Sequence, residues 1–241
     1  MRILVCGLTA LLLSTNLAAA GTSIDVDIVS ADGAKLRATY TTPGKPGPAM
    51  LLIHQCNMDR TAWKGLTGHL VDAGVHVLAM DLRGFGESPG ELMRSRADFQ
   101  ALMKKSPPDV DAALAYLLDQ DGVNGSNVAA GGASCGAMLT ADLASRNDSI
   151  TTLMLLSGPP SDDALEHIMG TKKLAVFTAA TSGDTEIPGV ARRLKITAEK
   201  SPNKKSTAKI FEGTEHGLPM FAKNPSLGPD LVEWLTKRLA R

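Results

Sequence analysis

The chain has 241 residues, of which 44% are hydrophobic and 21% are charged, and this composition is ordinary for a globular protein with one sizeable core. Its 25 Lys and Arg residues balance its 25 Asp and Glu residues, so the charge gives no reason to expect a nucleic acid or an anionic membrane as a partner. The densest basic run, KSPNKK at 200–205, lies beside proline and asparagine, which favours a solvated loop over a binding patch.

The first twenty residues differ in kind from the rest. Arg2 is followed by a short apolar run, polar residues at 14–16 interrupt that run, and three alanines end at Ala20. This pattern is typical of a cleaved secretory signal, and the apolar part is too short for a membrane anchor of about 20 residues. We therefore expect residues 1–20 to be a signal peptide and residues 21–241 to be a periplasmic or extracellular domain without a membrane anchor.

The mature part opens with two stretches of alternating apolar and polar residues, at 23–30 and 35–42, which predict an antiparallel hairpin. Short apolar runs then alternate with segments of helical spacing, which predicts a mostly parallel sheet with helices on both faces. We expect strands at 49–54, 75–80, 127–133, 151–157, 174–180 and 207–213, and helices at 60–73, 108–120, 134–146, 188–199 and 229–240. In such sheets, functional residues gather at the carboxyl ends of the strands.

A possible nucleophile lies between an expected strand and an expected helix, where residues 132–136 read Gly-Ala-Ser-Cys-Gly. In the pattern G-x-S-x-G, a sharp strand-to-helix turn exposes the serine above the sheet, and the glycines let the helix pack closely. Ser134 is therefore the predicted nucleophile. Counted from Cys135, both glycine positions become alanines, so the cysteine fits the pattern less well.

A serine nucleophile needs a general base, and a histidine base needs an acid that orients its ring. His216 is the best base because it lies in EGTEHGLPM, a loop after the last expected strand. Asp184, in ATSGDTE after the strand at 174–180, is the leading acid, with Glu186 as its neighbour and Asp162 or Asp163 as more remote options. The remaining histidines fall in or at the ends of expected strands and helices: His54, His69, His76 and His167.

Several separated segments together resemble the α/β-hydrolase superfamily, closest to compact serine esterases and dienelactone-hydrolase-like members without a large lid. They are LLIHQCNMDRTAW, VHVLAMDLRGFGES, VAAGGASCGA, FTAATSGDTE and FEGTEHG, and the resemblance covers essentially all of 21–241. It implies an α/β-hydrolase fold, a small-molecule ester as substrate, and catalysis by Ser134, His216 and Asp184 through an acyl-enzyme. The segment 87–107 is the one longer insertion, and it is placed to flank the pocket.

The resemblance also implies that the backbone N–H groups of Cys56 and Cys135 form the oxyanion hole. Gln55 stands where many family members have glycine, which leaves the conformation of that loop open. Because two amides that bind one oxygen must be close neighbours, a Cys56–Cys135 disulfide is one expectation and two free thiols are the other.

Two other functions stay open at this stage. The chain could be a non-catalytic binding protein on a hydrolase fold, since a fold does not determine a function. It could also be a dienelactone-hydrolase-like enzyme that uses a thiol, although Ser134 occupies the matching position. We expect no cofactor or metal, because the sequence has neither a G-x-G-x-x-G fingerprint nor ligand spacing of His, Cys and Asp.

Overall fold

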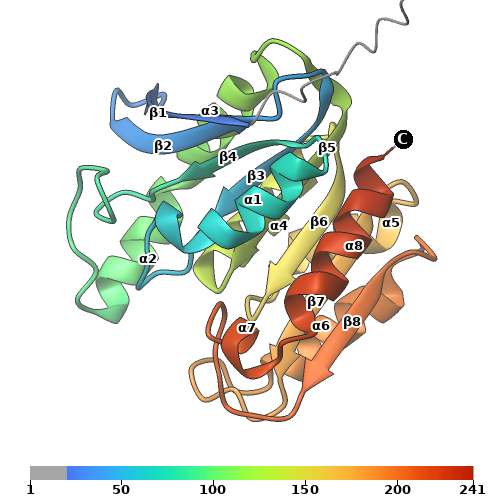
Figure 1. The fold of residues 1–241 in the computed structure, drawn as a ribbon. Helices are drawn as coiled ribbons and strands as arrows, with labels where there is room; N and C mark the ends of the chain where they lie inside the picture. Colours follow the sequence, from blue (N-terminus) through green and yellow to red (C-terminus); the bar gives the residue numbers. More distant parts are fainter. Residues whose placement is uncertain (1–20, 241) are drawn as a thin grey trace, which may run out of the picture.

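The structure, a computed structural model, describes residues 21–240, so the expected signal peptide lies outside the described residues. Its centre is an eight-stranded sheet in the order β1-β2-β4-β3-β5-β6-β7-β8 (Figure 1). The strands are β1 (Thr22–Val29), β2 (Lys35–Thr42), β3 (Gly47–Ile53), β4 (His76–Met80), β5 (Val123–Ala133), β6 (Ile150–Leu156), β7 (Ala175–Thr181) and β8 (Thr207–Phe211). The hairpin β1–β2 and the pair β2–β4 are antiparallel and all other pairs are parallel, which confirms the predicted fold class.

Helices cover both faces of this sheet (Figure 1). They are η1 (Arg60–Trp63), α1 (Lys64–Asp72), α2 (Arg96–Lys105), α3 (Pro107–Leu118), α4 (Cys135–Arg146), α5 (Asp162–Gly170), α6 (Val190–Lys200), α7 (Met220–Lys223) and α8 (Leu227–Leu239). The helices α3, α4, α5 and α6 pack on one face, and α1 and α8 pack on the other. Among residues 21–240, no helix is both long enough and apolar enough to cross a membrane.

The central strands are buried on both faces, which explains their continuous apolar runs. Leu51 and Ile53 of β3 belong to the core beneath α3 and α4, while Leu52 belongs to the core beneath α1 and α8. Successive side chains on a strand point to opposite faces, so a strand covered on both sides needs apolar residues at every position.

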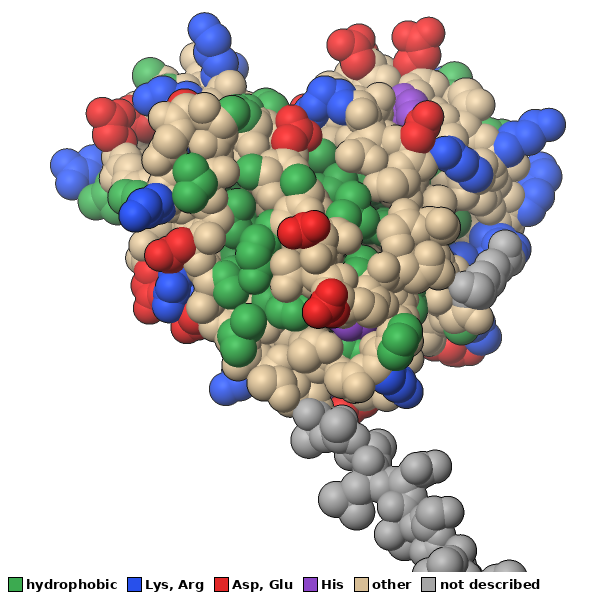
Figure 2. Space-filling view, turned by 90° about the horizontal axis from the view of Figure 1, so that it is seen from above, with side chains coloured by type: hydrophobic (Ala, Val, Ile, Leu, Met, Phe, Trp, Pro, Cys, Tyr) green, Lys and Arg blue, Asp and Glu red, His purple; other side chains and the backbone are tan. Residues whose placement is uncertain are grey.

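The face shown in Figure 2 has no large patch of only acidic or only basic side chains. Acidic and basic side chains are interspersed around its rim, and hydrophobic side chains are exposed between them. This arrangement agrees with the net charge of zero.

Four parts of the helical layer differ from the sequence-based expectations, and two of them are the helices α5 and α7, which lie where no helix was expected. The expected helix at 60–73 begins with the 3₁₀ turn η1, where the Asp59 side chain accepts a hydrogen bond from the Thr61 N–H. The helix α2 lies inside the segment 87–107, where no helix was expected. Leu102 is its one buried residue among those described, so its apolar periodicity is weak, although Ser95 caps its first turn.

Candidate active site

Ser134 lies at a sharp turn between β5 and α4. Its φ of 52° and ψ of −122° place a non-glycine residue in a sparsely populated region, and its N–H donates to the Leu156 carbonyl at 2.7 Å. The side chain does not cap the helix, and its Oγ makes no hydrogen bond within the described part of the chain. The turn therefore presents an unengaged hydroxyl at the carboxyl end of the sheet.

The two glycines of the G-x-S-x-G pattern are required by close backbone contacts. A Cβ on Gly132 would overlap the carbonyl carbon of Gly136, and a Cβ on Gly136 would overlap the carbonyl oxygen of Ile53. Hydrogen atoms at these positions let α4 begin directly against β5 and β3. The two positions that admit only glycine are thus the two that flank Ser134 in the G-x-S-x-G pattern, which favours Ser134 over Cys135 as the central residue of the motif.

His216 and Asp184 meet because they follow neighbouring parallel strands, β8 and β7. The Nδ1 atom of His216 lies 2.7 Å from Oδ2 of Asp184, and the side chains are 11% and 1% exposed, respectively. The other carboxylate oxygen, Oδ1, accepts the N–H groups of Glu186 and Ile187 at 3.0 Å each. Because an ionised carboxylate only accepts hydrogen bonds, Nδ1 carries the proton and Nε2 is left as an acceptor.

The other acids considered from the sequence do not contact His216. Glu186 lines the same pocket, but its backbone, rather than its carboxylate, joins the Asp184 network. Asp162 and Asp163 lie in the exposed first turn of α5. Asp184 is therefore the one carboxylate among residues 21–240 that bonds to this ring.

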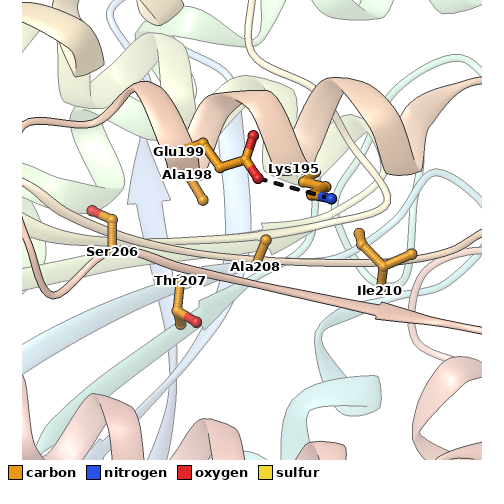
Figure 3. Close-up of a pocket in the computed structure, with 7 residues that line it drawn as sticks. All are labelled: Lys195, Ala198, Glu199, Ser206, Thr207, Ala208 and Ile210. Carbon is orange, nitrogen blue, oxygen red and sulfur yellow. Dashed lines mark ion pairs between the residues drawn. The ribbon is translucent and has the colours of Figure 1, made fainter.

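Ser134 and His216 line one open pocket of about 560 Å³. The full lining is Gln55, Cys56, Asn57, Met93, Arg96, Phe99, Ser134, Met138, Glu186, Ile187 and His216. The segment 87–107 supplies Met93, Arg96 and Phe99, so it flanks the pocket. Another hollow, between α6 and β8, contains none of the candidate groups and holds the ion pair of Lys195 and Glu199 (Figure 3).

The two cysteines form a disulfide, with 5.9 Å between their Cα atoms. The backbone N–H groups of Cys56 and Cys135 donate to no acceptor within the described residues, although both cysteines lie beside Ser134. Two free amides close to an unengaged hydroxyl can bind one developing negative charge.

Gln55, which the sequence singled out only as a departure from glycine, connects two parts of the site. Its Oε1 accepts the Leu218 N–H at 2.8 Å, and its Nε2 donates to Oδ1 of Asn57 at 2.7 Å. Its backbone carbonyl accepts the Nδ1–H of His54 at 2.8 Å. The sequence signal for this role is the glutamine itself, because its side-chain amide can hydrogen-bond a neighbouring loop and a glycine at this position cannot.

His54 supports the loop without reaching the pocket. It is fully buried, and its Nε2 accepts the Leu82 N–H at 3.0 Å. Burial lowers the pKa of His54 below its usual value. Both ring nitrogens are therefore used within the structure, Nδ1 as a donor and Nε2 as an acceptor.

Nothing in the described range forms a metal centre, since no three His, Cys, Asp or Glu side chains within 21–240 are grouped so that they could hold an ion.

Comparison with known families gives a match to the model described as "Hydrolase_4: Serine aminopeptidase, S33" over residues 44–209. This range contains Ser134 and Asp184 and ends before His216. Two uncharacterized proteins of Mycobacterium tuberculosis, from strains CDC 1551 / Oshkosh and ATCC 25618 / H37Rv, are each 34% identical over 122 residues. The match covers 50% of this chain and 40% of each relative, so this chain spans less than half of their length.

Solved structures of esterases share the fold. The Pyrococcus furiosus esterase Pf2001 superposes with a TM-score of 0.71 at 17% identity, covering 90% of this chain and 91% of that one. A cold-adapted esterase from an Arctic intertidal metagenomic library has a TM-score of 0.70 at 17% identity, covering 92% and 95%. A Klebsiella pneumoniae protein assigned as a dienelactone hydrolase has a TM-score of 0.68 at 15% identity, covering 90% and 98%.

Proposed function

Because this chain belongs to the serine aminopeptidase S33 (Hydrolase_4) family of α/β hydrolases, we propose that it is a serine hydrolase that cleaves small carboxylic esters. The observation that carries the proposal is the 2.7 Å contact between His216 and Asp184 at the rim of the pocket that Ser134 lines. This contact fixes the proton on Nδ1 and leaves Nε2 to act as the base.

In the proposed reaction, Ser134 Oγ attacks the ester carbonyl while Nε2 of His216 takes the hydroxyl proton. Asp184 stabilises the imidazolium that forms, and the free N–H groups of Cys56 and Cys135 bind the oxyanion. The imidazolium returns its proton to the leaving alkoxide, which departs as an alcohol. Water, deprotonated by the same ring, then attacks the acyl-enzyme, and the carboxylic acid leaves as Ser134 regains its proton.

The pocket supports a small or medium acyl group. Its apolar wall is made by four side chains from three parts of the chain: Met93, Phe99, Met138 and Ile187. Only the short helix α5 lies between β6 and β7, so no cap domain is inserted there. An open pocket of about 560 Å³ suits a compact ester better than a bulky lipid.

We also propose that the protein acts outside the cytoplasm. The disulfide between Cys56 and Cys135 supports this, because disulfides persist in oxidising compartments and are rare in reducing ones. Mass spectrometry of the chain recovered from the host's exported fraction tests it, since the proposal requires a mature N-terminus near Gly21.

The hydrolase proposal is tested by assaying purified mature protein against p-nitrophenyl esters of increasing acyl length, beside Ser134→Ala. A fluorophosphonate probe should label the wild type and leave Ser134→Ala unlabelled, whereas Ser145→Ala, a serine of α4 outside the pocket, should label normally. A chain that neither labels nor turns over any ester is a binding protein instead. Activity that survives in Ser134→Ala and disappears after reduction and alkylation would identify thiol chemistry, which requires Cys135 to leave its disulfide.

A further inference from the structure

A second polar pocket, of about 510 Å³, lies at the opposite edge of the sheet from Ser134. It opens at the amino ends of β5, β6 and β7, beside the loop that leads into β8 and the last turn of α8. Its lining residues are Asn124, Ser126, Asn127, Thr151, Thr152, Lys172, Lys173, Ala175, Asn203, Lys205 and Arg238.

This lining contains four cations and no carboxylate. Lys173 donates to the Asp148 carbonyl at 2.7 Å and lies 3.6 Å from its carboxylate. Lys172, Lys205 and Arg238 form no ion pair within residues 21–240. The three unpaired cations thus form a local excess of positive charge in a chain whose net charge is zero. Because they lie around one pocket, they repel one another.

The backbones that carry two of these lysines are held together by Asn203. Its Nδ2 donates to the Lys172 carbonyl at 2.9 Å, and its Oδ1 accepts the Lys205 N–H at 3.0 Å. The indole N–H of Trp234 donates to the Lys205 carbonyl at 2.9 Å. Three hydrogen bonds at the protein surface therefore set the spacing of the two lysine backbones.

Arg238 adds a guanidinium from the last turn of α8. A cation at this end of a helix suits the helix dipole, but the dipole alone does not satisfy its donors. The Nε atom of Arg238 is buried and has no acceptor among the described residues. The hollow between α6 and β8 offers a contrast, because its lysine, Lys195, lies 3.9 Å from the carboxylate of Glu199 (Figure 3).

We propose that this pocket binds a small molecule bearing phosphate groups with at least two negative charges. Lysine and arginine are the cations that proteins use for phosphate, and Ser126 and Asn124 at the pocket wall add hydroxyl and amide donors. A diphosphate would be attracted by Lys172, Lys205 and Arg238 together, with no carboxylate in the lining to repel it. The site is separate from the ester pocket and does not depend on the activity proposed there.

Calorimetric titration of the mature protein with inorganic pyrophosphate tests the proposal, and Ser134→Ala protein should bind equally because hydrolysis plays no part. The double variant Lys172→Ala/Lys205→Ala should weaken binding by at least about tenfold, since removing charge-assisted contacts costs that much or more. The affinity should also fall as salt is added. Lys204→Ala is the matched control, because Lys204 is the exposed neighbour of Lys205 and does not line the pocket.

Arg238→Gln provides a second variant that keeps an amide donor but removes the charge, and circular dichroism checks that it folds. It should also weaken pyrophosphate binding. The proposal is overturned if pyrophosphate shows no saturable binding below about 10 mM, or if Lys204→Ala loses as much affinity as the double variant. Binding only to vesicles that contain phosphatidylglycerol would likewise overturn it, because a surface that recognises packed lipid headgroups is not a small-molecule pocket.

Discussion

The side chain of Gln55 hydrogen-bonds the backbone of Leu218 at 2.8 Å, across 163 positions of the sequence. This bond joins the loop that contains Cys56 to the loop that contains His216, and Gln55 is only 3% exposed. Gly217 lies against the same oxygen with a φ of +66°, so the histidine loop turns directly over the glutamine. The position of the proposed base is thereby tied to the proposed oxyanion hole.

We expect Gln55→Leu to lower kcat by about 10- to 100-fold, because it leaves the half-buried Leu218 N–H without its acceptor and loosens the loop that holds His216. Gln55→Glu keeps an acceptor oxygen at the same place, and Asn57 can turn its amide to donate, so this variant should recover most of the activity. Steady-state kinetics with a p-nitrophenyl ester measures both. Equal losses in the two variants would contradict a positioning role.

Asp184→Asn should fold normally and lower kcat by up to about 10⁴-fold, since an amide at this position permits the wrong tautomer of His216. Glu186→Gln is the matched control, because Glu186 lines the pocket but its carboxylate does not contact the ring. It should change kcat only slightly. The reverse pattern, with Glu186→Gln inactive and Asp184→Asn active, would show that the acid is misassigned.

Breaking the disulfide should cost both stability and rate. The bond closes a loop of 79 residues, for which chain entropy gives about 4.5 kcal/mol of unfolding free energy. The double variant Cys56→Ser/Cys135→Ser should lose that amount in urea denaturation and should lower kcat more than it raises KM, because the two proposed oxyanion donors are no longer held together. Intact mass with and without alkylation serves as the check, since two alkylated thiols in unreduced protein would remove the basis of this prediction.

The free energy of unfolding should fall as the pH drops below about 6.5. Burial lowers the pKa of His54, so the unfolded chain takes up a proton at this site before the folded chain does. Each histidine of this kind contributes at most about 1.4 kcal/mol per pH unit to the slope of the unfolding free energy against pH. Burial lowers the pKa of His76 in the same direction. His54→Asn should be less stable but should show a flatter slope in urea titrations between pH 5 and 7.

Gly136→Ala should destabilise the protein by about 1–3 kcal/mol, because the added methyl group would overlap the carbonyl oxygens of Ile53 and His54. Gly68→Ala in α1 is a matched change, since a Cβ there meets no atom within 4 Å. It should stabilise the helix by up to about 1 kcal/mol. Thermal denaturation of both variants measures the difference, and a neutral Gly136→Ala would show that the turn at Ser134 is looser than the structure indicates.

The eight strands and the helices α1, α3, α4, α6 and α8 could be predicted from the sequence, because burial on both faces of a sheet imposes continuous apolar runs and amphipathic helices keep their own spacing. The position of Ser134 between a strand and a helix could also be predicted, since the apolar run, the flanking glycines and the helical spacing are all local sequence features. The helix α2 was not predicted, because Leu102 is its one buried residue among those described and a helix that buries so little shows almost no apolar periodicity.

Which acid meets His216 depends on contacts that form only in the folded chain. Asp184 and Glu186 are two residues apart, and the direction of each carboxylate depends on a loop whose backbone N–H groups hold Oδ1 of Asp184. The basic run at 200–205 shows the same limit, because its expected solvated character does not reveal that Lys205 lines one pocket with Lys172 and Arg238. Local patterns report how a segment is buried, whereas the direction of a loop side chain is set by contacts with residues far away in the chain.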